Sequence, residues 1–167
     1  LAKVEWNTIM FFVGLFMLIG CLEYVGLFAF LGKQLVGYTS GNLLLTCLVV
    51  LWFSALISAV VDNIPLVMSM IPVVKSIIPA FAAQMGLDPG SAEVTSQIAE
   101  PLYWSLALGS CLGGNGSLVG ASANIVVAQI AKRNNYRLTF FGFTRYAFPL
   151  MLFSVVISSI YIYLRYF

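Results

Sequence analysis

A run of glycine, serine and asparagine residues interrupts an otherwise apolar stretch between positions 109 and 124. The run is densest at Gly113-Gly114-Asn115-Gly116-Ser117, and Ser122 and Asn124 follow closely. Three glycines in four residues allow the backbone to adopt positive φ angles and to expose its carbonyl and amide groups. Asparagine and serine side chains add neutral donors and acceptors. We expect this run to break a helix and to bind an ion or a small polar molecule.

The two sides of such a break differ in polarity. A helix that resumes near Leu118 would point its free N–H groups into the gap, so the amides of 118–120, with the side chains of Asn115 and Ser117, would hold an anion. The preceding helix would end with carbonyl oxygens near Gly113, which suit a cation.

The same glycines also fit a purely structural interpretation. Gly109 and Gly113, like Gly116 and Gly120, have the G-x-x-x-G spacing of closely packed helices. Close packing alone does not require the neighbouring asparagines and serines, so the binding interpretation is favoured.

A second interruption, Asp62-Asn63-Ile64-Pro65, lies inside another apolar run. A carboxylate in such a run is costly and marks either a function or a buried partner. Asp62 and Asn63, with carbonyls near Gly113, would therefore hold a sodium ion, or Asp62 would accept a proton. Asp62 is also suited to cap the helix that starts at Ile64, and the two roles are compatible. We expect Asp62 and Asn115 to face each other across a hydrated cleft halfway through the membrane.

The composition predicts an integral membrane protein. Apolar residues make up 61% of the 167 residues, charged residues only 8%, and the mean hydropathy is +1.00, whereas about a quarter of a soluble domain is charged. There is no histidine, and the three cysteines lie apart in apolar segments, which argues against a disulfide framework or a zinc site. No nucleophile–base pair or set of metal ligands is recognisable, so we expect no enzyme and no cofactor beyond a coupling Na⁺ or H⁺. No nucleic-acid partner is expected.

The apolar pattern predicts an all-α, polytopic fold in which residues 1–167 form one transmembrane transport domain. A membrane span needs about 20 helical residues, and the expected elements are a span over 8–30, a re-entrant hairpin or a pair of spans over 43–81, a broken helix over 101–131 and a span over 140–163. A polar connection is expected over 32–42, and an exposed loop over 84–100. A hairpin with its tip at Asp62–Pro65 is favoured over two spans, because an exposed turn would carry more polar residues.

Basic residues orient this arrangement. Lys132, Arg133, Arg137 and Arg145 surround one short loop, which the positive-inside rule places in the cytoplasm. The polar segment over 84–100 then lies outside.

At three motifs the chain resembles the ion transporter superfamily, which includes arsenite permeases, NhaD-type sodium/proton antiporters and sodium-coupled carboxylate symporters. The motifs are Val4–Thr8 leading into Phe11–Phe16, then Ser58–Pro65, and Leu112–Asn124. They most resemble the subgroup of the melanosomal P protein and its bacterial relatives, and the chain is similar to the carboxyl-terminal half of such a permease.

The resemblance implies an inverted-repeat fold, with Asp62 and Asn63 at a hairpin tip and Gly113–Ser117 in an unwound helix. In the related carboxylate symporters these elements bind sodium and substrate, and the proteins are homodimers that work by an elevator motion. Their hairpin carries a Ser-Asn-Thr signature, where this chain has Asp62-Asn63-Ile64. The resemblance therefore does not carry a carboxylate substrate over to this chain.

The residues and the resemblance together predict an ion-coupled secondary transporter for a small inorganic anion or oxyacid, working by alternating access in a lipid bilayer. The expected partners are the missing amino-terminal repeat of the permease and a second copy in a homodimer. A sodium/proton antiporter, a channel-like anion conductance and a non-transporting scaffold of packed helices are the alternatives.

Overall fold

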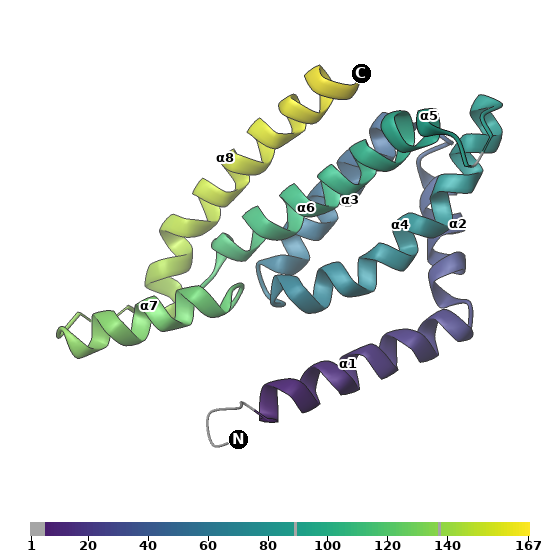
Figure 1. Cartoon of the computed structure of the whole chain (residues 1–167). Coiled ribbons are helices and arrows are strands. Elements are labelled where there is room, and N and C mark those ends of the chain that lie inside the picture. Colours follow the sequence, from purple (N-terminus) through teal and green to yellow (C-terminus); the bar gives the residue numbers. More distant parts are fainter. Residues whose placement is uncertain (1–5, 89, 137) are drawn as a thin grey trace.

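The computed structural model describes residues 6–88, 90–136 and 138–167. The predictions that rest on Val4, Glu5 and Arg137 lie outside these residues. The described chain is helical, without strands, and this confirms the all-α prediction for these residues (Figure 1). The main helices are α1 (Trp6–Tyr24), α2 (Leu27–Tyr38), α3 (Leu43–Ser58), α4 (Asn63–Met85), α6 (Glu100–Gly113), α7 (Ser122–Arg133) and α8 (Phe140–Tyr166). Three short helical segments complete the order: α5 (Ala92–Val94), the π-helical η1 (Thr95–Ala99) and the 3₁₀-helical η2 (Gly114–Gly116).

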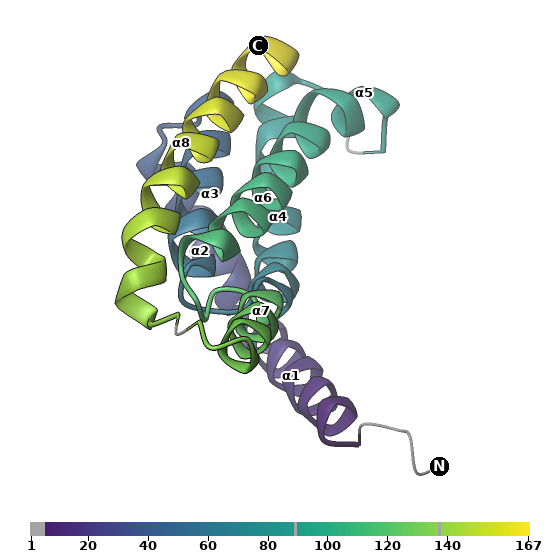
Figure 2. The ribbon, with the colours of Figure 1, turned by 90° about the vertical axis from the view of Figure 1, so that its left-hand side faces the viewer.

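Helices α3 and α6 form the centre of the structure and lie side by side along most of their lengths (Figures 1 and 2). Their close approach depends on two glycines of α6. A Cβ atom at Gly109 would overlap the carbonyl of Leu51, and one at Gly113 would overlap the backbone of Ala55. The packing interpretation of the G-x-x-x-G spacing is therefore confirmed for this pair. Apolar side chains from α3, α4 and α6 fill the space around this contact.

The span expected over 8–30 contains a bend and is not one straight helix. Helix α1 ends at Tyr24, and α2 continues after Gly26 at an angle of 66°. Gly26 has φ 78°, a left-handed conformation that ends a helix at low cost only at glycine. The apolar residues on either side of Gly26 hide this break in the sequence.

Because α2 reaches Tyr38, the polar connection expected over 32–42 is reduced to a tight turn. The Thr39 hydroxyl donates to the Leu35 carbonyl (3.0 Å) and accepts from the Thr46 hydroxyl (2.7 Å), which ties α2 to α3. The Asn42 side chain accepts from the Leu45 amide and caps α3. The polar side chains of Thr39, Asn42 and Thr46 therefore lie together where α2 meets α3.

The polar segment expected as a loop over 84–100 is also more helical than predicted. Ser91 accepts a hydrogen bond from the Val94 amide and starts a helical path through α5 and η1 into α6. The helical path therefore begins about two and a half turns before residue 101, where the broken helix was expected to start. Serine capping decides the boundary here.

Helices α3 and α4 form a helical pair that reverses direction at residues 59–62, called the α3–α4 turn below (Figure 1). Helix α4 packs mainly against α2 and α6, and the Ser76 hydroxyl reaches the Phe28 carbonyl (3.2 Å) beside Gly32. Helices α4 and α8 are each long and apolar enough to cross a membrane, and the bent pair α1/α2 counts as a third span if it crosses as one. Helix α3 has 16 residues and is shorter, so a re-entrant hairpin and two spans both stay open for 43–81.

Candidate ion and substrate site

The helix predicted over 101–131 is interrupted, and the interruption is longer than expected. Helix α6 ends at Gly113, η2 follows, and the backbone is extended at Ser117 and Ala121. Helix α7 starts only at Ser122, four residues after Leu118. Residues 114–121 are called the break below.

The glycines of the break act through their small size and not through positive φ angles. Among the described glycines, positive φ occurs only at Gly26, Gly41 and Gly86, so that part of the prediction is wrong. A Cβ atom at Gly120 would lie 2.8 Å from the carbonyl oxygens of Ser58 and Gly114. Glycine is needed where two backbones approach this closely.

Asn124 holds the two ends of the break together. Its side-chain amide donates to the carbonyl of Gly114 (3.0 Å) and to that of Ser117 (2.9 Å). The Ser117 hydroxyl accepts from the amides of Val119 (3.2 Å) and Gly120 (3.1 Å). Two of the three amides expected to bind an anion are therefore already hydrogen-bonded inside the break.

The break is in direct contact with the end of α3. The Ser117 hydroxyl donates to the carbonyl of Ala59, and the Ser58 hydroxyl donates to the carbonyl of Ser110 (2.6 Å). Ser58 and Ser117 are buried. The two interruptions that the sequence singles out, more than 50 residues apart, thus meet in space through side-chain-to-backbone hydrogen bonds.

Asp62 ends the α3–α4 turn. It is half-buried and is the N-cap of α4, accepting from the Ile64 amide (3.3 Å), which confirms the capping interpretation. Asn63, also half-buried, is the first residue of α4. Within residues 6–88, 90–136 and 138–167, neither the Asp62 carboxylate nor the Asn63 side chain has a charged partner, and Asn63 has no side-chain hydrogen bond. Both therefore keep oxygen atoms available for a cation.

Asn115 faces α8 and not the α3–α4 turn. It is exposed and lines a cavity of about 460 Å³ against the first half of α8. The other lining residues are Leu138, Gly142, Phe143, Tyr146, Ala147, Leu150, Met151 and Ser154. Asp62 does not line this cavity, so its opposition to Asn115 across one cleft stays a prediction. Ser122 is exposed at the start of α7, where no side chain caps the helix.

Met151 of α8 packs against residues of both interruptions. A Cβ atom at Gly116 would lie 2.9 Å from the Met151 methyl group, and Ala59 packs in one cluster with Met151. Met151 follows the first residue of α8 by 11 positions and precedes the last by 15, or about 16 Å and 22 Å at 1.5 Å per residue. Gly116 of the break and Ala59 of the α3–α4 turn therefore pack beside Met151, away from both ends of α8.

The sequence profile of the citrate transporter family matches residues 1–109, a range that includes the α3–α4 turn. The chain belongs to this family of the ion transporter superfamily. It is accordingly an integral membrane protein, as the composition predicts.

Pairwise comparison extends the likeness across the break. An uncharacterized transporter of Mycobacterium bovis is 36% identical over 167 residues, which cover 100% of this chain and 36% of the relative. The 46 kDa membrane protein of Mycobacterium leprae is 36% identical over 166 residues, covering 99% of the chain and 36% of that protein. The P protein of Sus scrofa is 39% identical, covering 97% of the chain and 18% of that protein. The chain thus spans about a third of the mycobacterial relatives and less of the P protein; no solved structure matches it.

The contribution of α8 to the environment of the break could not be predicted from the residue pattern. Tyr146 and Met151 belong to an apolar helix whose periodicity does not say which face meets the break. The carbonyls of Ser58 and Ala59 are likewise invisible in a residue pattern, although Ser58 lies one turn before Asp62.

Proposed function

We propose that this chain is part of an ion-coupled secondary transporter that moves a small inorganic anion or oxyacid by alternating access. Its family and its relatives are transporters, which supports the general class. The substrate, the coupling ion and the activity of the whole protein are our proposal.

One observation carries this proposal: the two interrupted segments touch each other, and Gly116 and Ala59 pack against Met151 of α8. If α8 crosses the membrane, as its length allows, these contacts lie about 16 Å and 22 Å from its two ends. Irregular backbone at that depth persists only where protein or a wet cavity surrounds it. Pairs of broken segments near the midplane are how secondary transporters build substrate and ion sites.

The residues divide between two roles. Asp62, Asn63 and backbone carbonyls next to Gly113 would hold the coupling Na⁺, or Asp62 would carry a proton. Asn115 would contact the anion from the cavity beside α8, and the first amides of α7, near Ser122, would favour its charge. Asn124 and Ser117, with Gly114 and Gly116, would keep the break in shape. An amino-terminal repeat of the permease and a second copy of it are proposed to complete the assembly.

A sodium/proton antiporter is the second candidate. It is favoured by the state of Asp62, which has one amide partner and no charged partner among the described residues. Such a carboxylate is free to exchange a proton for sodium. In this case the anion would be dispensable and Asp62 would be the main functional residue.

The test is flux in liposomes that contain the purified full-length protein. A panel of oxyanions is offered under imposed sodium, proton and anion gradients. We expect uptake of at least one anion that depends on the sodium or proton gradient. Cation exchange without any anion would support the antiporter, and current without fixed stoichiometry would indicate a channel.

A matched pair of variants locates the anion. Asn115→Leu replaces the amide by an apolar group of similar size, and Val119→Leu is the control on an exposed residue of the same break. We expect Asn115→Leu to lower anion uptake by about tenfold or more, since one lost hydrogen bond to a charged group costs about 1.5–3 kcal/mol. Equal uptake by the two variants would remove Asn115 from the site. No flux of any ion in the unmodified protein would refute the proposed function itself.

A further inference from the structure

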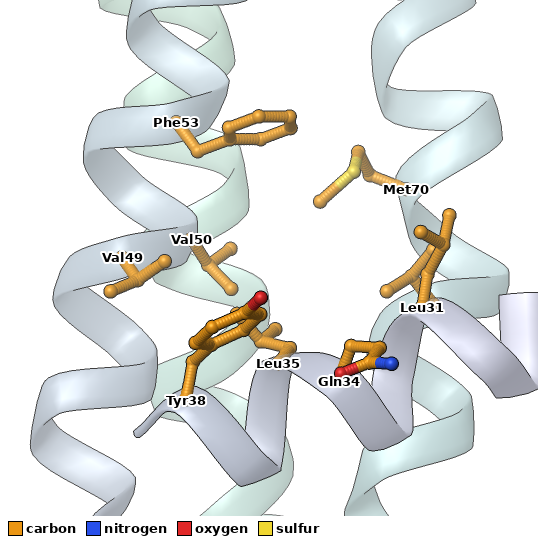
Figure 3. A pocket seen from close by; sticks show the side chains of 9 residues that line it. Leu31, Gln34, Leu35, Tyr38, Val49, Val50, Phe53 and Met70 are labelled. Carbon is orange, nitrogen blue, oxygen red and sulfur yellow. The ribbon is translucent and has the colours of Figure 1, made fainter.

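A second cavity lies on the other side of α3 from the break, where α2 crosses α3 and α4 (Figure 3). Its volume is about 230 Å³, and its walls are apolar except for the side chains of Gln34 and Tyr38. An apolar cavity of about 150 Å³ already stays dry and takes up a ligand such as benzene. This cavity is therefore suited to a hydrocarbon group and not to an ion.

The polarity of the cavity changes from one end to the other. Gln34 and Tyr38, four residues apart on α2, lie at one end, and Phe53 and Met70 lie at the opposite end (Figure 3). Tyr38 is 84% exposed and is followed at once by the polar turn that joins α2 to α3. A ligand that fits this gradient has a polar head and an apolar tail.

The position of the polar end agrees with a membrane surface. The turn after Tyr38 carries Ser40, Gly41 and Asn42, and a Cβ atom at Gly41 would meet the side-chain amide of Gln84, so polar groups gather there. Tyrosine is enriched where a membrane protein passes from hydrocarbon to headgroups, which suits Tyr38 at this end of the cavity.

The open side of the cavity faces an apolar surface. Phe30 and Leu31 on α2 and Val49 and Phe53 on α3 are exposed there by more than a third. In an integral membrane protein such a surface meets lipid chains.

We propose that this cavity is a binding site for one acyl chain of a phospholipid. The chain enters beside Tyr38, passes Leu35 and Val50, and ends between Phe53 and Met70. The headgroup stays near Gln34 and Tyr38, which offer a side-chain amide and a phenol hydroxyl as donors. The bound chain fills the space between α2 and the α3–α4 pair. It therefore stabilises the packing of α2 against the two helices that flank Asp62.

Photolabelling of the full-length protein tests this assignment. The protein is placed in vesicles of phosphatidylethanolamine and phosphatidylglycerol doped with a phosphatidylethanolamine that carries a diazirine near the middle of one acyl chain. After irradiation, labelled residues are located by mass spectrometry. We expect enrichment at Phe53 and Met70 over the exposed lipid-facing residues Ile157 and Ile160 of α8.

A pair of tryptophan variants, one inside the cavity and one outside it, controls for specific labelling. Val49→Trp places an indole in the groove, and Leu56→Trp places the same group on the same face of α3 two turns farther on, outside the lining. We expect labelling at Met70 to fall by about tenfold in the first variant, a shift of about 1.4 kcal/mol in binding, and to stay unchanged in the second.

Equal labelling of Met70 in both variants would overturn the proposal. Labelling in the unmodified protein that is no stronger at Phe53 and Met70 than along α8 would overturn it as well, and this readout does not depend on any variant being folded. Disulfide trapping of Val49→Cys by a cysteine placed elsewhere in the full-length protein would show that protein, not lipid, covers the groove.

Discussion

The two interruptions are held in place by different means. The α3–α4 turn is fixed locally, because Asp62 caps α4 with its own side chain two residues before the amide that it binds. The break is fixed by contacts between segments, because Asn124 reaches back ten residues to Gly114 and Ser117 reaches across to Ala59. The cap of the α3–α4 turn thus comes from its own segment, whereas the hydrogen bonds of the break depend on α3 and α7.

Residues of the same type have different roles in and around the break, depending on whether they are hydrogen-bonded within it or exposed. Asn124 has its amide in two structural hydrogen bonds, whereas Asn115 is exposed in the cavity beside α8. Ser117 is buried and bonded on several sides, whereas Ser122 is exposed. Replacing Asn124 or Ser117, which hold the break together, should mainly lower stability. Replacing the exposed Asn115 should mainly weaken ion binding.

The largest effect is expected at Gly113. In Gly113→Ala the new methyl group would overlap the backbone of Ala55, which cannot move like a flexible side chain. Overpacking of this kind costs about 1–3 kcal/mol or more, so the thermal unfolding temperature of the purified protein should fall clearly. Gly20→Ala in α1 is the control: nothing lies within 4 Å of its Cβ position, and alanine is favoured over glycine in a helix by about 0.5–1 kcal/mol. Equal stability of the two variants would mean that α3 and α6 are not packed as described.

The next effect separates the two asparagines. Asn124→Ala removes the donor to the carbonyls of Gly114 and Ser117, two hydrogen bonds that contribute about 0.5–1.5 kcal/mol each. Asn115→Ala removes no hydrogen bond found among the described residues. We expect a lowered unfolding temperature for Asn124→Ala and an unchanged one for Asn115→Ala. The reverse order would show that the break is arranged differently.

Ser117 should show how strongly the two interruptions are coupled. Ser117→Ala removes the bond to Ala59 and the acceptor for the amides of Val119 and Gly120. We expect a loss of about 1–2 kcal/mol: the bond to Ala59 contributes about 0.5–1.5 kcal/mol, and the two longer bonds from Val119 and Gly120 add little because they share one acceptor. Hydrogen exchange should rise at Val119 and Gly120 together. A rise confined to one of the two amides would contradict the shared acceptor. The exposed Ser122, changed to alanine, is the control.

The sequence was sufficient to predict what depends on residue type. The membrane class follows from composition, the two interruptions from Asp62-Asn63 and from the glycine cluster, and the capping role of Asp62 from helix chemistry. It was not sufficient where tertiary contacts decide. Gly26 ends a helix inside an apolar run, α7 starts late because the hydrogen bonds of Ser117 and Asn124 fix a non-helical path before it, and the contact with Met151 depends on how α8 packs.

The smallest effect on stability, with a large one on function, is expected at Asp62. Asparagine caps a helix about as well as aspartate, so Asp62→Asn should keep the bond to the Ile64 amide and unfold within about 0.5 kcal/mol of the unmodified protein. Asp62→Ala removes the cap and should cost about 1 kcal/mol. If the carboxylate carries the coupling ion, both variants lose cation-driven flux in liposomes, although only the alanine variant is less stable. The contrary result is that Asp62→Ala loses flux while Asp62→Asn keeps it with unchanged sodium dependence. Asp62 would then act only as a helix cap, and the coupling ion would be held by Asn63 and the carbonyls of the break.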